Sequence, residues 1–96
     1  MSMKEAYRQK MEAELEWAKA KLAEAKDESR SLAADARVTY ATQIAAAEQK
    51  LEQIRSKLLD LDVAGDDAWG QVKEGLDQAW TGLSAAIRNV VASFKK

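Results

Sequence analysis

Apolar side chains recur every three or four residues from residue 3 to residue 61, which is the period of an α-helix. This stripe keeps its phase over its whole length, and Ser29 is its only polar member. No glycine or proline interrupts residues 4–62. We therefore expect one uninterrupted helix over about residues 3–62, about 87 Å long at a rise of ~1.5 Å per residue.

The sequence Val-Ala-Gly-Asp-Asp at residues 63–67 predicts a turn. Gly65 suits the left-handed backbone that often ends a helix, and Asp66 or Asp67 suits the N-cap of the next one. A second apolar stripe of the same period then predicts a helix over about residues 68–95. The pattern thus favours a single all-α domain over residues 1–96, built as a long helical hairpin.

The alternative fold is a monomeric three-helix bundle with a break near residues 26–31. These residues are polar, and Ser31 could cap a new helix there. The continuous phase of the stripe and the lack of glycine and proline favour the hairpin instead.

An 11-residue repeat runs through the second stripe, where Trp69, Trp80 and Val91 are eleven residues apart. This period corresponds to 3.67 residues per turn, which is typical of a nearly straight or slightly right-handed supercoil rather than a heptad zipper. In pattern alone, the repeat resembles the amphipathic repeats of exchangeable apolipoproteins.

The predicted second helix is about half as long as the first, so it leaves the N-terminal part of the long stripe uncovered. Leaving apolar side chains in water forfeits ~1.5–3 kcal/mol each, so we expect the chain to assemble with itself as a dimer or larger coiled-coil bundle. The expected oligomer interface comprises Met3, Tyr7, Met11, Leu15, Leu22, Leu32 and Val38. The expected contact between the two helices comprises Tyr40, Ile44, Leu51, Ile54, Leu58, Trp69, Val72, Leu76, Trp80, Leu83, Ile87 and Phe94.

Small residues form a row on the second predicted helix, namely Gly75, Ala79, Gly82 and Ala86. Glycine inside a helix lowers the stability of the helix by up to about 1 kcal/mol relative to alanine. A row that contains two glycines is therefore expected to have a role in packing. We expect it to allow another helix to approach closely.

The composition of the chain argues against catalytic activity. The chain has 15 Lys and Arg against 16 Asp and Glu, a net charge of −1, and no His or Cys. Imidazole bases, thiolate nucleophiles and the common zinc ligands are therefore absent, and no one-signed basic face predicts nucleic-acid binding. We expect a non-catalytic structural or partner-binding protein, with no cofactor and no metal.

The alternative function is binding to a lipid surface. Residues 78–94 carry one charge and are followed by Lys95 and Lys96, a character that suits a helix lying in a membrane interface. This segment is too short and too polar to span a bilayer. In this alternative, Trp17, Val90 and Val91 contact a partner or lipid, and the protein is peripheral to the membrane. With either function we expect a cytoplasmic protein.

The sequence contains four characteristic segments: Tyr7-x3-Met11, Trp17, Ala36-Arg37-x2-Tyr40-x3-Ile44 and Gly65-Asp66-x-Ala68-Trp69-x2-Val72-Lys73-x-Gly75-x-Asp77-x-Ala79-Trp80. Together these segments resemble a group of small bacterial proteins described as coiled-coil-domain proteins of unknown function. The resemblance covers most of the chain and implies a bacterial, helical, non-enzymatic protein, without active residues to transfer.

Overall fold

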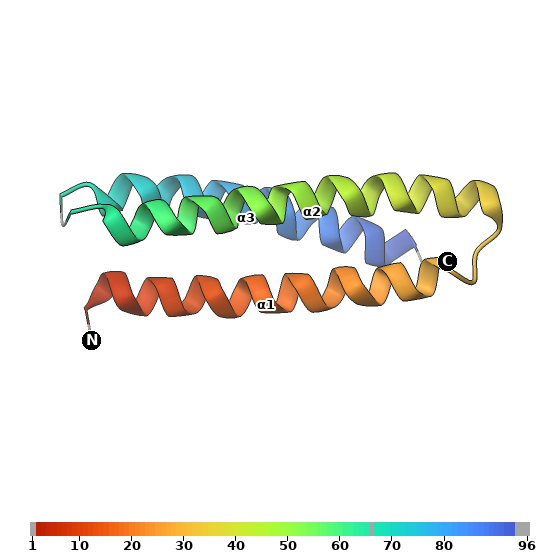
Figure 1. Cartoon of the computed structure of the whole chain (residues 1–96), viewed down its shortest axis with the longest axis horizontal. Helices are drawn as coiled ribbons and strands as arrows, with labels where there is room; N and C mark the ends of the chain where they lie inside the picture. Colours follow the sequence, from red (N-terminus) through yellow and green to blue (C-terminus); the bar gives the residue numbers. More distant parts are fainter. Residues whose placement is uncertain (1, 66, 94–96) are drawn as a thin grey trace.

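Three α-helices pack side by side in the computed structural model, which describes residues 2–65 and 67–93. They are α1 (Met3–Ser29), α2 (Ala34–Val63) and α3 (Trp69–Ser93). Figure 1 shows α2 returning antiparallel to α1, and α3 running back beside both. The helices measure 51 × 20 × 17 Å together, far shorter than the expected rod. The described part of the chain is thus an all-helical, three-helix bundle.

The predicted single helix over residues 3–62 is wrong, because the chain turns between Ser29 and Ala34. At the end of α1, the Ser29 hydroxyl donates to the Lys26 carbonyl at 2.7 Å and the Ser31 hydroxyl to the Glu28 carbonyl at 2.8 Å. Backbone bonds of the shorter i to i+3 type accompany them, as from the Leu32 N–H to the Ser29 carbonyl at 3.1 Å. Serine side chains that bond local backbone groups favour helix ends over helix interiors, which explains a break without glycine or proline.

Ser31 closes the first helix and does not cap the second. The N-cap of α2 is Ala33, which is extended (ψ 156°) and offers no side-chain hydrogen bond. The loop over residues 30–33 happens to preserve the phase of the stripe, so the apolar period reads the same on both sides. The stripe therefore lies on two antiparallel helices that face each other.

The second turn falls where the sequence predicts it, but its geometry differs. No described glycine, Gly65 included, has a positive φ, so the expected left-handed position is absent. The Gly65 carbonyl instead accepts from the N–H groups of Ala68 at 3.0 Å and Trp69 at 3.1 Å, which starts α3. Asp66, one of the two expected caps, lies outside the described residues.

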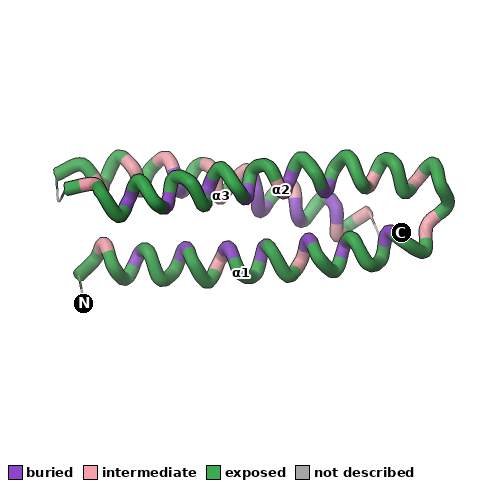
Figure 2. Tube along the Cα trace, in the orientation of Figure 1, coloured by how far each residue is buried: buried purple, intermediate pink, exposed green. Residues whose placement is uncertain are grey.

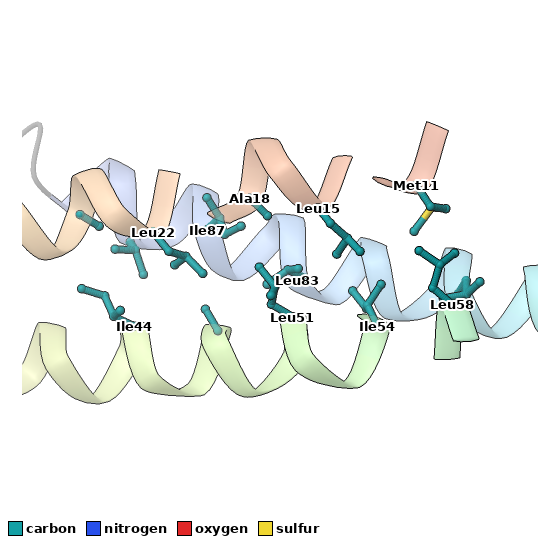
Figure 3. Close-up of a cluster of buried hydrophobic side chains, with 14 of the residues drawn as sticks. Met11, Leu15, Ala18, Leu22, Ile44, Leu51, Ile54, Leu58, Leu83 and Ile87 are labelled. Carbon is teal, nitrogen blue, oxygen red and sulfur yellow. The ribbon is translucent and has the colours of Figure 1, made fainter. Parts of the chain in front are cut away.

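The core lies between the three helices along their common length (Figure 2). Each helix contributes one apolar face at helical spacing, and the close-up shows these faces meeting (Figure 3). The fully buried large side chains are Met11 from α1, Ile54 and Leu61 from α2, and Leu76, Leu83 and Ile87 from α3. Because α3 covers both of the other helices, a single chain encloses most of the stripe that the hairpin would have left in water.

The small-residue row of α3 does not receive a neighbouring helix. A Cβ atom built on Gly75 or Gly82 would meet no atom within 4 Å beyond their own helix. The predicted close helix approach is therefore absent at these two positions in the single chain.

None of the described helices combines the length and apolar character that a membrane crossing requires.

Candidate interaction surfaces

A cluster of polar and aromatic side chains joins the N-terminal halves of α1 and α3 through hydrogen bonds and an ion pair. The Tyr7 hydroxyl donates to Asp77 Oδ1 at 2.6 Å and also lies 3.3 Å from the carbonyl oxygen of Lys73. The Lys73 ammonium pairs with Asp77 Oδ2 at 3.2 Å and lies 5.2 Å from the centre of the Tyr7 ring. Trp69 packs at the other side, with its ring centre 6.4 Å from that of Tyr7.

The surroundings of Tyr7 and Asp77 shift the pKa values of both groups in the directions that stabilise the hydrogen bond between them. Burial, followed by the hydrogen bond and the charge of Asp77, raises the pKa of Tyr7 far above its usual value. The hydrogen bond from Tyr7, with help from Lys73, lowers the pKa of Asp77 below its usual value. A tyrosine held protonated by its own acceptor is a poor base or nucleophile, so the cluster is best described as a link between helices.

The residues expected at an oligomer interface fall into two groups. Tyr7, Met11, Leu15 and Leu22 are buried inside their own chain, which corrects the prediction that another subunit covers them. The physical reason is the turn after Ser29, which brings α2 and α3 onto this face. The other three remain accessible: Met3 is 79% exposed, Val38 is 67% exposed and Leu32 is partly buried in the loop.

Most residues expected between the helices lie in or beside the core. The buried ones are Ile44, Leu51, Ile54, Leu58, Leu76, Leu83 and Ile87. Partly buried and packed against them are Tyr40, Trp69, Val72 and Trp80. Phe94 lies outside the described residues.

The three residues expected to contact a partner or lipid have different surroundings. Val90 is only 2% exposed and belongs to the core, so it is not available to a lipid surface in the closed bundle. Val91 is partly buried against the core. Trp17 is 42% exposed, and its ring meets that of Trp80 edge-on at 6.0 Å, so it lies on the seam between α1 and α3.

A surface that the sequence did not single out is the groove between α1 and α2. Two hollows of about 650 and 370 Å³ lie along it, and Arg55 lines both. Leu15, Leu22, Leu51 and Leu58 line its floor. Leu59 stands at its rim with 64% of its surface exposed, although it too is a large apolar side chain.

Opposite charges face each other across this groove. Two pairs join the helices, from Arg8 Nε to Asp62 Oδ1 at 3.1 Å and from Lys26 Nζ to Glu48 Oε2 at 2.9 Å. Between these pairs, Glu16 lines the same hollow as Arg55. Lys19 lines the next hollow with Glu52, so the order of charges on one rim complements the order on the other.

In the part of α2 that precedes the groove, an exposed line of small and apolar residues follows the helical period. They recur at alternating steps of four and three, through Ala34, Val38, Ala41 and Ala45. Leu59 lies at the far end of the same line. The main stripe passes through Leu58, so the stripe alone assigns no role to Leu59. Its position off the stripe is the signal that could have found this surface.

Within residues 2–65 and 67–93, no group of three or more Asp or Glu side chains is placed to hold a metal ion.

Comparison with known proteins returned no matching family model, no matching curated protein and no matching solved structure.

Proposed function

We propose that this protein is a non-catalytic helical interaction module that binds a second copy of itself through the α1–α2 groove. The observation that carries the proposal is the groove itself, with an exposed Leu59 on a rim of complementary charges. Large apolar side chains left at the surface beside a groove are typical of interaction sites.

Charge order favours a second copy as the partner. When two copies face each other about a two-fold axis parallel to the helices, the α1 of each lies opposite the α2 of the other at the same level. The charges that already meet within one chain, such as Arg8 with Asp62, then meet again between chains. Such a face is complementary to itself, as a two-fold interface requires.

The resulting assembly has four central helices, with each α1 antiparallel to its two α2 neighbours, and an α3 on either outer side. Antiparallel neighbouring helices are the common arrangement of four-helix bundles. The bundle is 51 Å long and 20 Å wide, which is enough to supply the roughly 800 Å² per partner found in stable complexes.

The experiment replaces Leu59 by lysine and measures the mass of the protein in solution by light scattering. The unchanged chain is expected to be a dimer at micromolar concentration. Burying Leu59 contributes about 1.5–3 kcal/mol in each subunit, so its loss in both raises the dissociation constant roughly a hundredfold or more. Leu59 is exposed in the single chain, so the helix content of Leu59→Lys should stay unchanged.

Val63→Lys is the matched control, because Val63 is 85% exposed, belongs to the same helix and does not line the groove. It should remain dimeric. A wild-type protein that is monomeric over the whole concentration range would contradict the proposal, and so would a Leu59→Lys variant that dimerises as well as Val63→Lys.

The lipid-surface alternative finds no support in the closed bundle. Leu83, Ile87 and Val90 belong to the apolar face of α3, and all three are buried in the core. Contact with a bilayer through this face would require the bundle to open.

A further inference from the structure

A third hollow lies on the opposite side of α1, between α1 and α3. Its volume is about 270 Å³, and its apolar lining comes from Trp17, Ile87, Val91 and Ala92. Trp17 is held in place by its edge-on contact with Trp80, so one aromatic wall of the hollow is fixed by the fold.

The polar lining of this hollow, as far as the described residues form it, is entirely cationic. Lys21 from α1 and Arg88 from α3 both line it, and no described carboxylate does. Lys21 pairs with Glu24 at 3.5 Å, one turn further along α1, while Arg88 forms no ion pair with any described residue. Two cations beside an apolar hollow stand out in a chain whose net charge is −1.

We propose that this hollow binds a single-chain anionic amphiphile, with a fatty-acid carboxylate as the simplest member of the class. Its headgroup lies between Lys21 and Arg88, because hydrogen bonds between a carboxylate and a cationic donor are stronger than those between neutral groups. Its first methylene groups lie against the Trp17 ring and Val91. The hollow is slightly smaller than most ligand pockets, which range over about 300–1,000 Å³, and this size suits part of one alkyl chain rather than two.

The test titrates the protein with decanoate below its micelle concentration and follows the indole N–H signals by NMR. The Trp17 signal should shift with a saturable binding curve. The Trp69 signal serves as an internal reference, because Trp69 packs against Tyr7 and does not line the hollow.

Charge reversal identifies the headgroup contacts. Arg88→Glu and Lys21→Glu should each weaken decanoate binding by at least about tenfold, equivalent to 1.4 kcal/mol. Lys50→Glu should leave it unchanged, because Lys50 is an exposed cation of α2 that lines none of the three hollows. Decanol, which has the same chain without the charge, should bind at least tenfold more weakly than decanoate.

Several outcomes would overturn the proposal. One is equal shifts of all tryptophan signals, which indicates general adsorption of the detergent-like chain. Another is undiminished binding in Arg88→Glu. A third is binding to phosphatidylglycerol vesicles without binding to free decanoate, which would assign the surface to membranes instead.

Discussion

Tyr7 shows at the level of a single residue how the bundle is closed. Tyr7 is 7% exposed and belongs to the core, while its hydroxyl donates a hydrogen bond to Asp77 on α3. A hydrogen bond to an ionised group contributes about 1.5–3 kcal/mol, and the partial exposure of Asp77 places this one at the lower end. Tyr7 therefore fixes α1 against α3 at one end of the molecule.

Replacing Tyr7 by phenylalanine should lower the free energy of unfolding by about 1.5 kcal/mol at neutral pH, since the ring stays and the bond is lost. Chemical denaturation followed by circular dichroism measures this difference. In an Asp77→Ala background the same substitution should cost much less, because the acceptor is already missing. Equal costs in both backgrounds would show that the hydroxyl acts elsewhere.

The cost of Tyr7→Phe should also depend on pH. The pKa of Asp77 is lowered in the folded chain, mainly by the bond from Tyr7. The stabilisation is therefore fully present above the ordinary carboxyl pKa of 3.8 and is lost as the pH falls through the lowered folded value. A difference between wild type and Tyr7→Phe that grows in acid would contradict this assignment.

At the scale of single residues, the sequence does not reveal which group a polar atom will bind by a hydrogen bond. The helical period places Tyr7, Met11 and Leu15 on the apolar stripe, and all three are buried. The period alone does not reveal that Asp77 lies beside Tyr7, because the two are 70 residues apart and meet only once three helices are packed.

At the scale of elements, the start of α3 and the end of α2 follow from local sequence, but the break after α1 does not. Gly65 and its neighbours interrupt the period visibly, whereas residues 30–33 form a loop whose length preserves it. The polar run over residues 26–31 contains the needed signal, since Ser29 and Ser31 both bond to backbone carbonyls there. Phase continuity is weak evidence for a continuous helix when a loop spans about one turn.

The glycines of α3 give a second test at this scale. An added Cβ would contact no atom within 4 Å apart from the backbone of its own helix. Gly75→Ala and Gly82→Ala should therefore each stabilise the protein by about 0.5–1 kcal/mol. In a domain of this size, 1 kcal/mol corresponds to a rise in Tm of about 4–8 °C.

Ala85→Gly, at an exposed position of the same helix, is the matched reverse substitution and should lower the Tm by a similar amount. If either alanine variant loses stability or fails to dimerise, the small-residue row is a packing seam after all.

The whole molecule changes the reason for expecting self-association. A rod with a short cover would need partners to bury its stripe, but the folded chain buries that stripe itself and has a radius of gyration of only 15.5 Å. The groove between α1 and α2 stays open in the single chain, with Leu59 on its rim. The expectation of a second copy therefore moves from the apolar stripe to a surface of mixed charge and apolar character.

Mixing two charge-reversed variants tests this dimer most directly. Glu16→Lys and Arg55→Glu each create like charges across the groove, so each protein alone should be mainly monomeric by light scattering. In a 1:1 mixture, the lysine introduced in one chain faces the glutamate introduced in the other, and the second contact keeps its native charges. Dimers should reappear and contain one chain of each kind by native mass spectrometry. A mixture that stays as monomeric as its components would contradict the account.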